Sequence, residues 1–128
     1  MSVIQFSENR LVLTKRVIEI IRRARVNLSD EKQTQIDIAE VLTANHIPYQ
    51  REVRLTKKDI VDFMVGDVAV EVKLKTGASK ADVYRQLVRY AESKQVGALV
   101  LATNLSMGLP ETINEKPVYF ISLGRAWL

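Results

Sequence analysis

The amino-acid sequence predicts an α/β fold in which a central mixed β-sheet is flanked by helices. Three observations support this prediction. Two helical patterns precede a series of short strand patterns. A third helical pattern separates the third expected strand from the fourth, which permits a crossover between parallel strands. The run from Ala98 to Ala102 is apolar throughout, as in a strand that is buried on both faces.

Composition limits the class of protein. The 128 residues are 47% hydrophobic and 27% charged, so we expect a single globular domain, with residues 1–28 as a basic helical extension and residues 29–128 as the core. No apolar run approaches the roughly 18–20 residues of a membrane span, and the first residues lack the pattern of a secretory signal. For these reasons we expect no membrane partner, and the absence of cysteine fits a reducing compartment, so we expect a cytoplasmic protein. The net charge of +4 favours a polyanionic partner such as nucleic acid.

The first helix is expected from about Asn9 to Val26. Its apolar side is formed by Leu13, Val17, Ile20, Ile21 and Ala24. The opposite side is basic and carries Lys15, Arg16, Arg22 and Arg23. This basic side either contacts phosphates or is simply a solvated helix face.

Ser29 is expected to cap the second helix. Asp30 and Glu31 then lie in its first turn, where the helix dipole favours acids. The helix should end near Asn45 and His46, and we assign no chemistry to this histidine. The apolar side of the helix is formed by Ile36, Ala39, Val41 and Leu42.

The first three strands follow directly. Tyr49 to Leu55 is the first, with one face formed by Tyr49, Val53 and Leu55. The run from Asp59 to Lys75 is expected to be a hairpin around a two-residue turn at Gly66 and Asp67. One face of this hairpin is apolar and consists of Val61, Phe63, Val65, Val68, Val70 and Val72. The other face carries the charge and consists of Ile60, Asp62, Met64, Ala69, Glu71 and Lys73.

A third helix and two more strands complete the prediction. Thr76 to Ala78 ends the hairpin, and Ser79 with Asp82 resembles a capping box that opens a helix extending to about Lys94. Two apolar runs are expected to be strands buried on both faces, Ala98–Ala102 and Val118–Ile121. The longest loop should lie between them, over residues 104–116.

The hairpin register places the Asp62 carboxylate opposite the Glu71 carboxylate. Like charges at directly opposed positions destabilise a sheet, so a cation is expected to compensate. Two carboxylates beside Lys73, in a chain without cysteine, suit Mg²⁺ or Mn²⁺ better than zinc. Alternatively, Lys73 simply bridges the two acids on a solvated sheet face. Asp59 is a second candidate ligand, but its odd number places it on the core-facing side of the strand.

The spacing of these residues resembles the signature of the PD-(D/E)XK nuclease superfamily. Asp62, eight intervening residues and then Glu71-Val72-Lys73 match this signature, although Val61 replaces the proline of its name. The match covers residues 29–103. Glu31 resembles the acidic residue that many members carry on the preceding helix. Gln86 and Tyr90 resemble the Q-x-x-x-Y element of the RecB-like members.

The resemblance implies the restriction-endonuclease-like fold, with an α-βββ-α-ββ core and an extra N-terminal helix. It also implies roles for the site residues. Asp62, Glu71 and Glu31 would bind Mg²⁺ or Mn²⁺, and Lys73 would position or activate the attacking water. Two simpler readings remain open: Glu31 is favoured by the helix dipole in any case, and Tyr90, which shares a helix face with Gln86, is equally suited to the core.

The resemblance leads us to expect a metal-dependent nuclease that hydrolyses phosphodiester bonds, with a preference for DNA and for endonuclease action. A homodimer like the Holliday-junction resolvases of this superfamily would fit the additional helix. The basic residues near the site in sequence form the expected nucleic-acid track: Arg51, Arg54, Lys57, Lys58, Lys75, Lys80, Arg85 and Arg89. Aromatic residues, at 6%, are too sparse to predict a stacking platform for single strands. The alternatives are a DNA-binding or assembly protein that keeps the fold without cutting, and a basic structural domain without a nucleic-acid partner.

Overall fold

The computed structural model describes residues 3–76 and 79–124 and has an α/β fold. Its three helices are α1 (Val3–Arg23), α2 (Glu31–Ala44) and α3 (Lys80–Ala91). Its strands are β1 (Gln50–Arg54), β2 (Ile60–Val65), β3 (Val68–Lys73), β4 (Ala98–Thr103), β5 (Thr112–Ile113) and β6 (Lys116–Ser122). The six strands form one open mixed sheet in the order β1-β2-β3-β4-β6-β5. The predicted α/β class with a mixed sheet flanked by helices is therefore confirmed.

The strands pair as a mixed sheet, as predicted. β1, β2 and β3 are antiparallel neighbours, and β3, β4 and β6 are parallel neighbours. α3 makes the predicted crossover from β3 to β4. The predicted hairpin register is confirmed for the three pairs next to the turn, Phe63 with Val70, Met64 with Ala69 and Val65 with Val68, and regular pairing ends before Asp62 and Glu71. The turn at Gly66 has a positive φ of 60°, which glycine adopts without steric cost.

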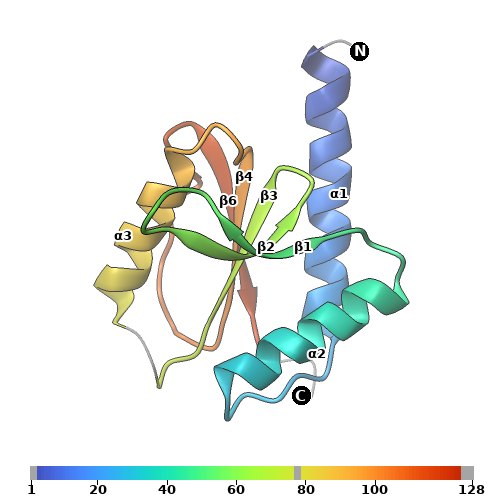
Figure 1. Ribbon diagram of the computed structural model, residues 1–128, viewed down its shortest axis with the longest axis vertical. Helices are drawn as coiled ribbons and strands as arrows, with labels where there is room; N and C mark the ends of the chain where they lie inside the picture. The colour runs from blue at the N-terminus through green and yellow to red at the C-terminus, as the bar shows by residue number, and fades with distance from the viewer. Residues whose placement is uncertain (1–2, 77–78, 125–128) are drawn as a thin grey trace.

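Helices cover both faces of the sheet (Figure 1). α1 and α2 lie on one face, where Val17, Ile21, Ile38 and Leu42 pack against Phe63 and its neighbours. α3 lies on the other face, where its buried side chains Val83, Leu87 and Tyr90 pack against the opposite sides of β3 and β4. β4 is buried along its whole length, as predicted, because it lies between both layers.

The N-terminal helices differ from the prediction at their ends. α1 begins at Val3 instead of Asn9 and ends at Arg23 instead of Val26. The N-cap of α2 is Asp30 and not Ser29, since the Asp30 side chain accepts the Lys32 N–H. Ser29 instead donates to Asn27. Ile36 was expected on the apolar side of α2, but it is 40% exposed, and Ile38 is the buried isoleucine.

β1 and β2 twist sharply where Glu52 lies beside Asp62. Glu52 has a positive φ of 52°, and the Glu52–Asp62 pair is missing from a β1–β2 register that is regular on both sides of it. Beyond the twist the strands change faces, so Val61 packs with the α3 layer although Phe63 packs with the α1 and α2 layer. The predicted single apolar face is therefore wrong at Val61. The same twist separates Tyr49 from Val53 and Leu55, which were expected on one face.

The C-terminal half also departs from the expected boundaries. Ser79 caps α3 as predicted, but the helix ends at Ala91 and not near Lys94. Gly77 and Ala78, expected to break the strand, lie outside the described residues. The loop expected over residues 104–116 contains the short strand β5, which pairs with β6. β6 is not buried on both faces, because only β5 lies beyond it and Phe120 is 39% exposed.

An ion pair joins α1 to the hairpin turn. The Arg10 guanidinium contacts the Asp67 carboxylate at 2.6 Å. Gly97 lies directly against this pair, since a Cβ at that position would be 2.2 Å from Asp67 Oδ2. Within residues 3–76 and 79–124, no helix has the length and apolarity needed to cross a membrane.

Candidate active site

The two predicted acids are held by the backbone of the opposing strand. The Asp62 N–H donates to Glu71 Oε1 at 3.1 Å, and the Val72 N–H donates to Asp62 Oδ2 at 2.8 Å. These bonds lie next to the twist of β2, just after the last regular pair, Phe63 with Val70. Each carboxylate therefore accepts a hydrogen bond from a backbone N–H group of the opposing strand. These bonds hold the two acids close together between β2 and β3.

α3 contributes a tyrosine and a glutamine to this point. The Tyr90 hydroxyl lies 3.2 Å from Glu71 Oε2 and donates to the Ile60 carbonyl at 2.8 Å. Gln86 Nε2 donates to the same hydroxyl at 2.7 Å. Tyr90 is fully buried and Gln86 is half-buried. Tyr90 therefore belongs to the core and also touches the Glu71 carboxyl.

Lys73 supplies the cation that faces the acids. Its Nζ lies 3.3 Å from Glu71 Oε2, and its side chain is 22% exposed. Asp59, the alternative acid, is engaged elsewhere, since it pairs with Arg89 at 2.8 Å and accepts from the Thr56 hydroxyl. Of the two candidate aspartates, only Asp62 shares hydrogen bonds with the Glu71 strand.

Burial raises the pKa of both acids. Glu71 is 2% exposed, and burial together with the nearby Asp62 charge raises its pKa to about 8 against the opposing effect of Lys73. Burial also raises the pKa of Asp62, although the Val72 N–H and Lys73 act in the other direction. Near neutral pH the metal-free pair therefore retains a proton that two isolated carboxylates would have lost.

The Tyr90 hydroxyl is the donor at the centre of this network. It donates toward the Ile60 carbonyl and Glu71 Oε2, and its lone pairs accept from Gln86. Burial, with the nearby carboxylates, raises the pKa of Tyr90, so its hydroxyl stays a donor. The hydroxyl therefore ties Glu71 to β2 and to α3.

Glu31 lies on the other side of Asp62, in a groove between α2 and the twisted strands. Its charge contributes to the raised pKa of Asp62. The groove has a volume of about 920 Å³, and we call it the α2–β1 groove. It is lined by Glu31, Lys32, Gln35, Ile36, Arg51, Glu52, Arg54, Ile60 and Asp62. The acid pair therefore opens toward a concave surface through Asp62.

Two of the three predicted metal ligands, Asp62 and Glu71, suit a hard divalent cation. Asp62 and Glu71 offer carboxylate oxygens that are already oriented by the backbone, which is the chemistry that Mg²⁺ and Mn²⁺ prefer. Glu31, the third predicted ligand, does not complete a compact set, because no three His, Cys, Asp or Glu side chains of the described residues are grouped as a metal site. The geometry thus fits a cation held by two acids and leaves its other positions to water or substrate.

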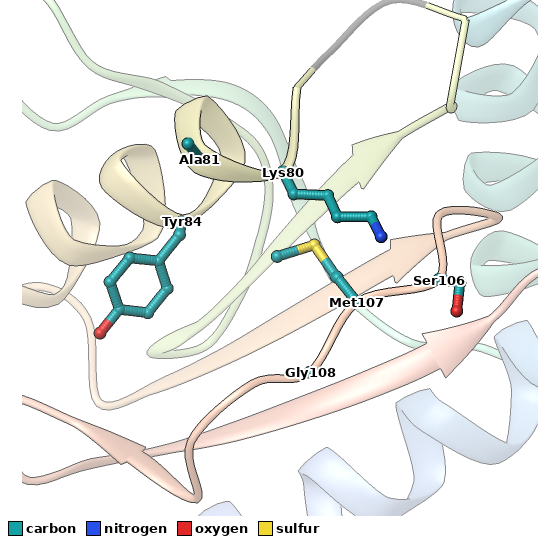
Figure 2. A pocket seen from close by; sticks show the side chains of 6 residues that line it. All are labelled: Lys80, Ala81, Tyr84, Ser106, Met107 and Gly108. Carbon is teal, nitrogen blue, oxygen red and sulfur yellow. The ribbon is translucent and has the colours of Figure 1, made fainter.

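A second hollow of the molecule lies away from these residues (Figure 2). It has a volume of about 530 Å³ and lies between the start of α3 and the segment after β4. Figure 2 shows Lys80 and Tyr84 from successive turns of α3 opposite Ser106 and Met107. None of the six predicted site residues lines this hollow, so we place the candidate site at the acid pair.

Comparisons with models of protein families, with curated protein sequences and with solved structures found no match to this chain.

Sequence reasoning anticipated some residues of the groove and missed others. Arg51 and Arg54 belong to the predicted basic track and do line the α2–β1 groove. Other members of the track point elsewhere, since Arg89 pairs with Asp59 and Lys80 lines the second hollow. The residues that were not predicted to line a site are Lys32, Gln35, Ile36, Glu52 and Ile60. No spacing signal marks them, because the groove forms only where the twisted strands meet α2.

Proposed function

We propose that this protein is a metal-dependent nuclease that hydrolyses phosphodiester bonds, with DNA as the favoured substrate. The site is made by Asp62, Glu71 and Lys73, supported by Gln86 and Tyr90. One observation carries the proposal: two carboxylates with raised pKa values are fixed by opposing backbone N–H groups, Glu71 faces the Lys73 ammonium group, and Asp62 lines a groove. Perturbed acids of this kind, next to a concave surface, are typical of functional sites.

The order of the elements supports the proposal at the level of the fold. The chain runs α2, β1, β2, β3, α3, β4, which is the helix, three strands, helix, strand order of the restriction-endonuclease-like fold. The acids and the lysine lie on β2 and β3 within that order. This likeness in topology and motif favours a nuclease, but the chemistry is argued from the site itself.

Each residue has a defined task in this proposal. Asp62 and Glu71 would hold the cation, with water or substrate at its other positions, and Glu31 would add negative charge beside Asp62. A bound Mg²⁺ or Mn²⁺ would neutralise charge on the scissile phosphate and lower the pKa of the attacking water. Lys73 would stabilise the negative charge that develops in the transition state. Tyr90 and Gln86 would hold Glu71 in place through the hydrogen bonds of α3.

A non-cleaving DNA-binding or assembly protein is the second candidate. It is favoured by one observation, that no three-ligand metal cluster exists among the described residues. Such a protein would bind DNA in the presence of a chelator and leave it intact when Mg²⁺ is restored.

The deciding experiment incubates the purified protein with closed circular and linear DNA, in double-stranded and single-stranded form, with Mn²⁺, with Mg²⁺ or with a chelator. We expect metal-dependent cleavage, and opening of closed circles would establish endonuclease action. Asp62→Asn, Glu71→Gln and Lys73→Met should each reduce cleavage by at least about 100-fold, as expected for groups that act in the transition state.

Matched controls separate the site from a general loss of charge. Glu40→Gln on α2 and Lys94→Met after α3 change exposed residues of the same types outside the site, and they should cleave at the wild-type rate. The proposal is wrong if Asp62→Asn cleaves normally, or if the wild-type protein leaves every substrate intact with both metals.

A further inference from the structure

The α2–β1 groove contains two isoleucines that the fold leaves exposed. Among the side chains that the structure describes, from residue 9 onward, six large hydrophobic ones are exposed: Leu11, Val12, Ile36, Ile60, Tyr84 and Phe120. Two of these, Ile36 at 40% and Ile60 at 39% exposure, line this one groove from different elements. Ile36 lies on α2 and Ile60 lies on β2, so the groove has apolar surface on two walls.

The core does not require these two side chains. α2 packs against the sheet through Ile38, Ala39 and Leu42, none of which is more than 7% exposed. Ile60 contributes its backbone carbonyl to Tyr90, while its side chain faces the groove. Exposed apolar surface that is concave and grouped, rather than scattered, is typical of a binding site.

Cations lie beside this apolar surface. Lys32, Arg51 and Arg54 line the same groove as the isoleucines. Arg51 is fixed over the Phe63 ring at 5.5 Å, and Arg54 donates to the Lys57 carbonyl at 2.8 Å, which orders both side chains along β1. The groove also holds three acids, Glu31, Glu52 and Asp62. Glu31 and Asp62 belong to the proposed cation site.

A ligand for this groove would bring apolar surface to the two isoleucines and negative charge to the three cations, and it would tolerate a cation at Asp62. Nucleotides of an unpaired strand have these properties. In a duplex the faces of the bases are stacked on one another and only their edges are accessible. Side chains within a groove can cover base faces only when the bases are unstacked, as in single-strand recognition.

We propose that the α2–β1 groove binds an unpaired segment of nucleic acid, with bases against Ile36 and Ile60 and phosphates at Lys32, Arg51 and Arg54. This inference rests on the proposed function, because the groove leads to the same acid pair, and it names the substrate as single-stranded, frayed or flapped nucleic acid. Aliphatic side chains take the place of the aromatic platform that the sequence lacks.

The test measures fluorescence anisotropy with a labelled single-stranded oligonucleotide and with the duplex of the same sequence, using the full chain and Ca²⁺ in place of Mg²⁺. Gel analysis verifies that neither probe is cut. The wild-type protein should bind the single strand about tenfold more tightly than the duplex. Ile36→Ser and Ile60→Ser should each weaken single-strand binding about fivefold, because each removes part of an apolar contact.

Three further variants define the contact. Val12→Ser, which changes a side chain 68% exposed on α1, should leave both affinities unchanged. Ile36→Leu keeps the apolar area and should retain single-strand binding. Arg54→Gln should reduce the dependence of log affinity on log salt by roughly 0.7 for the single strand, as for one lost phosphate contact.

The inference is overturned if the duplex binds as tightly as the single strand, if neither probe binds, or if folded Ile36→Ser and Ile60→Ser proteins bind like the wild type. These outcomes are distinct from failure of the proposed function. A protein that cuts DNA but prefers duplex would retain the nuclease proposal and lose this one. A protein that binds single strands through both isoleucines and never cuts would retain this inference and lose the nuclease proposal.

Discussion

Replacing Glu71 with glutamine should stabilise the metal-free protein at alkaline pH. Glu71 is buried beside Asp62, and its pKa is raised from an ordinary value of 4.5 to about 8. Between these two values the folded protein holds a proton that the unfolded chain has lost. A rise in pH therefore favours the unfolded state, and the free energy of unfolding should fall through this range.

The size of this effect follows from the two pKa values. Each pKa unit corresponds to about 1.4 kcal/mol, so the difference between 4.5 and about 8 is worth about 5 kcal/mol in total, with about 4 kcal/mol lost by pH 8. The raised pKa of Asp62 acts in the same direction. Because small domains are stable by only about 5–15 kcal/mol, this loss is a large part of the whole.

Glu71→Gln imitates the protonated acid. Its amide oxygen can still accept the Asp62 N–H, and its amide nitrogen can donate to the Tyr90 hydroxyl. The variant should match the wild type near pH 5 and exceed it by about 2–4 kcal/mol near pH 8, the lower value allowing for unfavourable contact with Lys73.

Urea denaturation in the presence of a chelator, followed by circular dichroism from about pH 5 to about pH 8.5, measures this difference. Glu40→Gln, which alters an exposed acid on the same protein, should follow the wild-type curve. If the proposed cation site exists, Mg²⁺ should restore stability to the wild type at high pH and leave Glu71→Gln unchanged. Wild-type stability that is flat over this range, or a variant less stable than wild type near pH 8, would refute the burial argument.

Three further predictions concern neighbouring residues. Tyr90→Phe leaves Glu71 and the Ile60 carbonyl without their hydroxyl partner, so we expect a loss of about 1–3 kcal/mol in urea denaturation, whereas an unchanged midpoint would contradict the network. Gly97→Ala should displace the Arg10–Asp67 ion pair that joins α1 to the hairpin turn and lower the thermal midpoint by several degrees. In a double-mutant cycle that combines Gly97→Ala with loss of this ion pair, simple addition of the two losses of stability would contradict the prediction. Lys73→Met removes the cation that lowers the pKa of Glu71, so the fall in stability should start at the same pH as in the wild type, continue to higher pH and end at a lower stability, while Lys94→Met keeps the wild-type profile in the same titration.

Local patterns predicted the hairpin because each signal lies within a few residues. Gly66 permits the positive φ of the turn, and alternation along β2 and β3 then sets which residues face each other. The contacts of Glu71 with Asp62 and Lys73 follow from that register and from the pleat. The Q-x-x-x-Y spacing also placed Gln86 and Tyr90 on one side of α3, where they do contact each other.

The same patterns could not predict the twist at Glu52. A positive φ is most often found at glycine or asparagine, so a glutamate does not predict one. The assumption of a regular pleat therefore failed at Val61 and Tyr49, which pack on faces opposite to those expected. The exposure of Ile36 was missed for a related reason. Helical periodicity predicts which side of α2 is apolar, but it does not show that the twisted strands leave a groove beside Ile36.

The α/β class, the pairing next to the hairpin turn and the candidate acids and lysine were predictable from the sequence, since these depend on short-range periodicity and turn chemistry. The depth at which the acids are buried, and with it their raised pKa values, was not predictable, because burial depends on how α3 covers the sheet. Tertiary packing also brings Glu31, Ile36 and Arg54 into one groove with Asp62. These residues come from separate elements, and their proximity follows from packing and twist, which no local spacing encodes.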